Sequence, residues 1–253
     1  MGMMVLAPLV VFAVSFVFPM LGMGGCQVLV PALFWMGMDF KTEAIPLALL
    51  LNLVTSSSAV LTYARRELID WRTGFPFALG ALALAPLGAW ANTRLASRFL
   101  IGVFAIEAAL ASAVMLSAWR PKRAVGSQRG RIMLGVGGGG TLGFLCGLIG
   151  RGGGSLAVPM LYASGLDAKR AAATSLFVVL CSTSASFASH IALAAAPQWS
   201  IWIGCLAAAL VGSQCGSRLM AAKLDSQTIR ILFGLVLAAI AAALIVRDVI
   251  LGH

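Results

Sequence analysis

The sequence contains the same glycine-rich pattern twice, as PMLGMGGCQVLVP at residues 19–31 and as GLIGRGGGSLAVP at residues 147–159. The two copies lie 128 positions apart, and apolar residues precede and follow each of them. Each glycine inside a helix costs about 1 kcal/mol relative to alanine, so clustered glycines favour a break in the helix. Two broken apolar segments at matching places in two halves are typical of a transporter's binding site.

The composition points to one class of protein. The chain has 253 residues, of which 60% are hydrophobic and 10% are charged, whereas a soluble domain carries about 25% charged residues. The net charge of +10 comes from basic residues in short loops between apolar runs, where they orient the chain and meet lipid head groups. We therefore expect a multi-pass protein of the cell (cytoplasmic, inner) membrane, with the lipid bilayer and no nucleic acid as a partner.

Three longer apolar runs follow each glycine stretch. They cover residues 44–64, 73–91 and 99–118 in the first half and residues 171–193, 201–219 and 229–246 in the second. A basic segment with Pro121, Gly126 and Gly130 separates the two sets. This organisation predicts a first repeat at residues 1–119, a cytoplasmic linker at residues 120–131 and a second repeat at residues 132–253.

The apolar run after each glycine stretch is too short to cross a bilayer, which takes about 20 residues. We therefore predict that each glycine stretch is the tip of a re-entrant hairpin, so that each half crosses three times. This arrangement puts 13 basic residues on the cytoplasmic side and four outside, whereas four crossings per half would give nine and eight. The positive-inside rule favours the first arrangement. The sequence thus predicts an all-α polytopic membrane protein whose two homologous halves are inverted repeats.

The repeated pattern G-x-G-G-[GC]-x-x-x-V-P, followed by a short apolar helix and a Ser/Thr-rich span, resembles the sulfite exporter TauE/SafE family, also called the four-toluene-sulfonate uptake family. The resemblance covers essentially the whole chain. It implies a membrane transporter for sulfite, a sulfonate or a related small sulfur-containing anion, and a homodimer. The first copy has Met23 and Cys26 opposite Arg151 and Gly154, which leaves open whether both tips contact the ligand equally.

The residues at the breaks also suit an anion. After each break a helix begins, near Gln27 and near Ser155, and a helix N-terminus presents unpaired N–H groups and about half a positive charge. Glycines let an oxyanion approach the backbone closely. We expect the anion to lie between the two tips while the halves rock around it. The predicted substrate-binding residues are Gly22, Gly24, Gly25, Cys26, Gln27, Asn52, Gly150, Arg151, Gly152, Gly153, Gly154, Ser155 and Thr174.

Two charged residues lie inside apolar runs. Arg151, in the second tip, is either a counter-charge for the anion, a partner of Glu107, or a side chain that reaches the lipid head groups. Glu107 either relays a proton or couples an ion, pairs with Arg151, or lies near an interface. Of the polar residues in the Ser/Thr-rich spans we expect Asn52 and Thr174 to line the path, while most of the others pack helices.

Other classes of function have less support. The five cysteines form no CxxC pattern, so we predict no disulfide framework, no metal site and no cofactor. The motifs GxxxxGK[ST], HExxH and GxSxG are absent from the sequence, and we predict that the chain is not an enzyme. Two alternatives stay open: an intramembrane thiol-dependent sulfur- or acyl-transfer enzyme that uses Cys26 or Cys146, and a non-transporting assembly factor.

Overall fold

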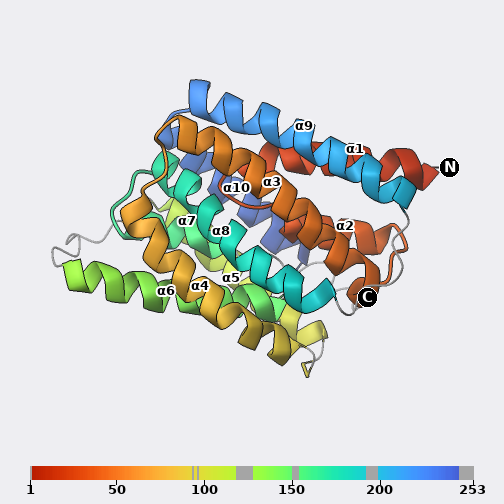
Figure 1. Ribbon diagram of the computed structural model, residues 1–253, viewed down its shortest axis with the longest axis horizontal. Helices are drawn as coiled ribbons and strands as arrows, with labels where there is room; N and C mark the ends of the chain where they lie inside the picture. Colours follow the sequence, from red (N-terminus) through yellow and green to blue (C-terminus); the bar gives the residue numbers. More distant parts are fainter. Residues whose placement is uncertain are drawn as a thin grey trace.

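The computed structural model is a bundle of α-helices (Figure 1). It describes residues 2–92, 94–95, 97–117, 128–149, 154–191 and 199–244, and none of these residues lies in a strand. The helices are α1 (Gly2–Met20), α2 (Cys26–Trp35), the single π-helical turn η1 (Phe40–Ala44), α3 (Ile45–Arg65), α4 (Trp71–Asn92), α5 (Ser97–Leu116), α6 (Gln128–Ile149), α7 (Gly154–Ala163), α8 (Ala168–His190), α9 (Trp199–Lys223) and α10 (Ser226–Leu244).

Several of the helices suit a membrane. Five segments are long and apolar enough to cross one: Thr42–Arg65, Trp71–Asn92, Ala168–Ala188, Trp199–Lys223 and Ser226–Ala243. Large apolar side chains cover their outer faces; Leu79 is 62% exposed and Ile203 is 61% exposed. Such surfaces are unfavourable in water but suit the hydrocarbon of a bilayer. The prediction of an all-helical membrane fold is confirmed.

The two halves have matching elements. The short helices α2 and α7 have ten residues each, and their first residues, Cys26 and Gly154, lie 128 positions apart, as do their last, Trp35 and Ala163. A long helix precedes each short helix, and three long helices follow it. Helix α6 begins at Gln128, so the end of the predicted linker 120–131 is helical. Residues 118–127 lie outside the described ranges, and the boundary between repeats stays a prediction.

The halves pack crosswise. Helix α1 packs on α9, and α4 packs on α6, so that the first α-helix of each half contacts the fourth α-helix of the other. Helix α3 also packs on α8, and α5 on α10 (Figure 1). The pairs α3–α8 and α5–α10 each join two matching helices. The pair α1–α9 corresponds to the pair α6–α4 when the two halves are exchanged. This reciprocity is the pattern expected of two repeats related by a two-fold axis.

Glycines bring the backbones of the crosswise pairs together. A Cβ on Gly80 of α4 would lie 2.3 Å from the carbonyl oxygen of Val136 in α6, and a Cβ on Gly216 of α9 would lie 2.0 Å from that of Phe16 in α1. Later residues of one helix meet later residues of the other, so α4 runs parallel to α6 and α1 runs parallel to α9. Small residues at such seams allow the close packing on which helix association in membranes depends.

The matching helices α3 and α8 run in opposite directions. Asn52 of α3 contacts Thr183 near the end of α8, whereas Tyr63, near the end of α3, lies in one apolar cluster with Ala172 and Leu176 near the start of α8. Figure 1 shows the two helices side by side over most of their length. The start of α3 and the start of α8 therefore lie at opposite ends of the bundle.

Helices α3 and α9 end, and helices α4, α8 and α10 begin, at the same end of the bundle. Hydrogen bonds connect the polar loops there. Lys169 Nζ donates to the carbonyl oxygens of Ala221 (3.0 Å) and Leu224 (2.9 Å), and Ser226 Oγ donates to Asp167 (2.7 Å). Such a cation at the last turn of α9 complements the helix dipole. We call this the basic end; its basic residues are Arg65, Arg66, Arg72, Lys169, Arg170, Lys223 and Arg230.

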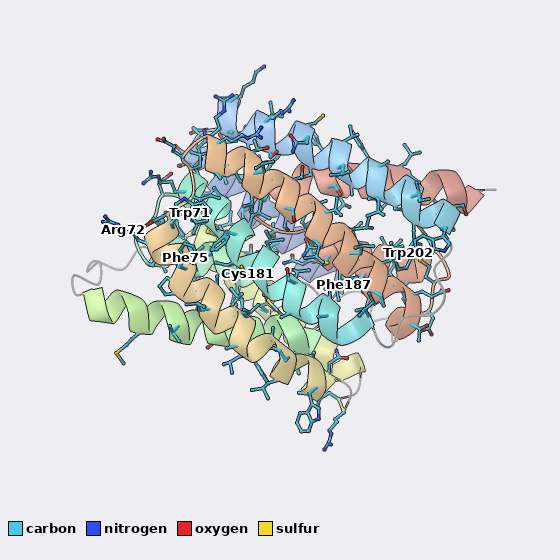
Figure 2. All side chains as sticks on the ribbon, viewed as in Figure 1. Trp71, Arg72, Phe75, Cys181, Phe187 and Trp202 are labelled. Atoms are coloured by element: carbon cyan, nitrogen blue, oxygen red, sulfur yellow. The ribbon has the colours of Figure 1, made fainter. Side chains whose placement is uncertain are left out.

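Aromatic residues lie toward both ends of the bundle. Trp71 and Phe75 of α4 pack edge-on against Phe177 of α8, with ring centroids 5.1 and 5.3 Å apart. Figure 2 shows Trp71 and Phe75 near Arg72 at the basic end and Trp202 toward the opposite end. Tryptophans at both ends are typical of the two membrane–water interfaces.

The seam between α4 and α6 yields a test of the packing. Gly143→Ala should lower the thermal unfolding midpoint, because the new methyl group would lie 2.1 Å from the carbonyl oxygen of Ala81, and overpacking costs about 1–3 kcal/mol. Gly137→Ala in the same helix is the matched control, since nothing lies within 4 Å of its methyl group. Both are measured by heating the protein in detergent and following its elution by size exclusion. Equal midpoints would contradict the close approach of α4 and α6.

Candidate functional site

The first glycine break is a tight turn between α1 and α2. Gly22 and Gly25 have φ angles of +78° and +73°, a region that only glycine enters at low cost. The amide of Met23 donates to the carbonyl of Phe18 (2.9 Å), which closes α1, and Cys26 then begins α2. The sequence forms this turn because glycine stands at both positions that need the left-handed conformation.

The second half holds this turn from one side. Ser175 Oγ of α8 donates to the carbonyl oxygen of Gly22 at 2.6 Å. A Cβ on Gly22 would lie 2.5 Å from Ala172 Cα, so no larger residue fits between the turn and α8. Tyr63 of α3 donates its hydroxyl to the carbonyl oxygen of Pro19 at 2.8 Å. The turn is therefore held by hydrogen bonds from both Ser/Thr-rich helices, α3 and α8.

Asn52 lies directly against the first break. A Cβ on Gly24 would lie 1.8 Å from Asn52 Oδ1. Asn52 Nδ2 donates to Thr183 Oγ1 at 3.0 Å, and Asn52 is fully buried. The predicted site residues Gly24 and Asn52 are thus brought together, and the hydrogen bond to Thr183 joins α3 to α8 beside them.

The first break meets the start of α7. Gly154, the first residue of α7, lies against the first break, where its Cβ would be 2.7 Å from Met23 Cα and 3.2 Å from the amide nitrogen of Gly24. Four predicted site residues of the second break lie outside the described ranges: Gly150, Arg151, Gly152 and Gly153. The contact is therefore established from the first residue of α7 onward.

The helices α2 and α7 begin near this contact and run to opposite ends of the bundle. Short connections lead from α2 to the start of α3 and from α7 to the start of α8, and those two starts lie at opposite ends. The N-termini of α2 and α7 therefore lie close together, deep among the long helices. Each helix N-terminus contributes about half a positive charge, so the contact is favourable for a negative group.

Gln27 is buried in the first turn of α2 without a hydrogen-bond partner. It is 2% exposed, and neither Nε2 nor Oε1 is bonded within the part of the chain that the structure describes. An unsatisfied buried polar group costs about 1–3 kcal/mol. Gln27 thus carries an unsatisfied buried amide at a helix N-terminus.

Ser155, at the matching position of α7, already has a partner. Its hydroxyl donates to Oε1 of Glu107 in α5, and both side chains are buried. The thiol of Cys146 in α6 interacts with Ser182 of α8 and lies near the carboxyl group of Glu107. The two predicted tips are therefore unequal: one carries an unpartnered amide and the other a hydroxyl bound to a carboxyl group. The predicted Arg151–Glu107 pair falls outside the described residues.

Two predicted site residues have other contacts. Thr174 Oγ1 accepts a hydrogen bond from the amide of Asp70 at 2.9 Å, so Thr174 fastens the loop before α4 near the basic end. Cys26 Sγ donates to the carbonyl oxygen of Ala48 at 3.0 Å, which ties α2 to α3. Their described contacts join elements of the fold, whereas Gly22, Gly24, Asn52 and Gly154 meet at the breaks.

Ser175 and Thr183 belong to the same constellation, although the sequence does not single them out. Both stand in a span that contains many hydroxyl residues. Only the crossing of α3 and α8 shows that Ser175 reaches Gly22 and that Thr183 reaches Asn52. The sequence of α8 alone does not indicate which of its hydroxyl residues contact the first break.

Comparison with known proteins agrees with the fold. The family profile described as "Sulfite exporter TauE/SafE" matches residues 7–244. A relative from Bacillus subtilis (strain 168), described as "Probable membrane transporter protein YunE", is 26% identical over 255 residues, which cover 91% of this chain and 93% of the relative. No solved structure matches the chain. The chain is thus a multi-pass membrane protein that belongs to the sulfite exporter TauE/SafE family, whose members are membrane transporters and not enzymes.

Proposed function

We propose that the protein carries a small sulfur-containing oxyanion, such as sulfite or a sulfonate, through a site where the first glycine break meets α7. The observation that carries the proposal is the buried, unpartnered side chain of Gln27 at the N-terminus of α2, beside a second helix N-terminus. The family name supports the choice of a sulfur oxyanion.

The chemistry of the site suits such an anion. An oxyanion accepts several hydrogen bonds, and the buried Nε2 of Gln27 offers a donor without another partner in the described part of the chain. The positive ends of two helix dipoles balance the charge without a full ion pair. We assign the binding site to Gly22, Gly24, Gly25, Gln27, Asn52, Gly154 and Ser155, with Arg151 and its neighbouring glycines completing it.

We also propose that the two halves are inverted repeats and that each glycine element is re-entrant. The opposite directions of α3 and α8 support the inversion. In each half the short helix returns from the break toward the end at which the long helix before it began (Figure 1). Two such elements that enter from opposite ends suit a carrier that exposes one site to either side in turn.

The distribution of charge supports a topology. The basic end carries the seven basic residues named above, whereas Lys41, Arg94 and Arg98 lie at the opposite end. Because cytoplasmic loops carry an excess of lysine and arginine, we assign the basic end to the cytoplasm and the protein to the cytoplasmic membrane. The homodimer implied by the resemblance stays a prediction.

Transport itself is the first test. Purified protein in liposomes should accelerate the entry of sulfite or of a sulfonate such as methanesulfonate, measured with a radiolabelled or fluorescent readout of the internal anion. Chloride should be moved more slowly, because it cannot accept the directed hydrogen bonds of the site. If the flux of every sulfur oxyanion equals that of empty liposomes, the proposed function is wrong.

Gln27→Leu should separate binding from stability. The variant removes a hydrogen bond to a charged ligand, worth about 1.5–3 kcal/mol, so anion affinity should fall about 10- to 150-fold. The same variant removes an unpartnered buried amide, so the empty protein should unfold at the same or a higher temperature. Calorimetric titration with the transported anion and thermal unfolding in detergent give the two values.

Gln214→Leu in α9 is the matched control. The amide nitrogen of Gln214 donates to Ser58 Oγ at 2.6 Å and to the carbonyl oxygen of Ser58 at 3.1 Å, away from the glycine breaks. This variant should lower stability and leave anion affinity unchanged. Unchanged affinity in Gln27→Leu would contradict the assignment of Gln27 to the site.

The topology can be checked by labelling single cysteines in a background in which the native cysteines are replaced. Arg66→Cys and Lys223→Cys at the basic end should react with a membrane-impermeant maleimide only after the membrane is permeabilised, because we assign this end to the cytoplasm. Arg94→Cys should react in intact spheroplasts. All three side chains are exposed in the structure. Labelling of all three positions from the same side would contradict the assignment.

A further inference from the structure

The second tip is bound by an acid of the protein itself. Glu107 lies in the middle of α5 and is 7% exposed, and its carboxyl group accepts the hydroxyl of Ser155. Ser155 is the second residue of α7, directly after the glycine that touches the first break. A buried carboxyl group thus lies at one of the two helix N-termini that form the proposed anion site.

The first tip lacks such an acid. At the position that matches Ser155, Gln27 has no partner among the described residues, and α10, the helix that matches α5, contains no acidic residue. This difference between the two tips is important because a carboxylate and a substrate anion are stabilised by the same groups, namely N–H donors and the positive end of a helix dipole.

An ionised Glu107 and an anion at the breaks would repel each other. For two unit charges about 5–6 Å apart at an effective dielectric constant of about 20, the repulsion weakens binding by on the order of 100-fold. A protonated Glu107 carries no charge and can donate a hydrogen bond. The anion therefore binds better to the protein when Glu107 is protonated.

We propose that Glu107 must take up a proton for the anion to bind tightly, so that the protein moves one proton together with each anion. This coupling rests on the proposed function of the site. The proton goes to a carboxylate oxygen of Glu107 as the anion enters, and it leaves when the anion has left on the other side. For a monoanion such as a sulfonate the transfer is electrically neutral, which avoids moving a net charge across the bilayer.

Uncharged groups of α6 and α7 lie beside Glu107. Cys146 faces it from α6, and Ser155 is its partner on α7, whose described part carries no charge. On α10 the one ionisable residue is Arg230, which donates to the carbonyl of Met115, eight residues further along α5. Eight helical residues span about 12 Å. Glu107 is thus the carboxyl group of this cluster in the described part of the chain.

The experiment measures the affinity of the purified protein for methanesulfonate and for thiosulfate between pH 5 and 8, where neither anion changes its charge. The affinity of the wild-type protein should fall as pH rises above the pKa of Glu107, by up to tenfold per pH unit for one coupled proton. Glu107→Gln imitates the protonated acid, so its affinity should be high and independent of pH. Glu43→Gln, at a half-buried position of η1 before α3, is the matched control and should keep the slope of the wild type.

Proton uptake by the wild-type protein gives a second readout that does not depend on a variant. In weakly buffered solution, binding of methanesulfonate above the pKa of Glu107 should take up close to one proton per anion, seen with a pH indicator. A flat wild-type affinity without proton uptake, or an unchanged slope in Glu107→Gln, overturns the coupling alone. If neither anion binds to the wild type or to Glu107→Gln at any pH, the proposed function fails as well.

Discussion

The close approach of Gly154 to Met23 and Gly24 is the contact on which the rest of the structure depends. It brings together the N-termini of two short helices that belong to different halves of the chain. Two partial positive charges repel each other, and the surrounding helices offer little water to screen them. A negative group nearby relieves this repulsion. The carboxyl group of Glu107 supplies one from within the protein when it is ionised, and the proposed substrate takes over this role when Glu107 is protonated.

The crosswise packing of the long helices makes this contact possible. Helices α1 and α9 and helices α4 and α6 approach along glycines, and α3 and α8 cross between them with Asn52 and Thr183 in contact. In a membrane the backbone at a helix break has to be covered by protein, since lipid cannot satisfy its polar groups. The hydrogen bonds from Ser175 to Gly22 and from Tyr63 to Pro19 provide this cover.

Much of the fold could be predicted from the sequence because membrane proteins follow strong rules. The apolar runs give the spanning helices, and the repeated glycines give both breaks, with α2 and α7 starting 128 positions apart. The contacts of α8 could not be predicted, since a helix rich in Ser and Thr gives no signal for which hydroxyl faces a glycine turn. Thr174 lies beside Ser175, yet it bonds to Asp70 near the basic end. One position along the helix changes the direction of a side chain by about 100°.

The glycine seams also limit how the protein can change shape. They join α1 of the first half to α9 of the second, and α4 of the first to α6 of the second, with backbone against backbone. A movement of one sequence repeat as a rigid body against the other would have to open both seams at once. A movement that keeps both seams closed has to carry α1 together with α9 and α4 together with α6, so each of its moving units would combine helices from both repeats.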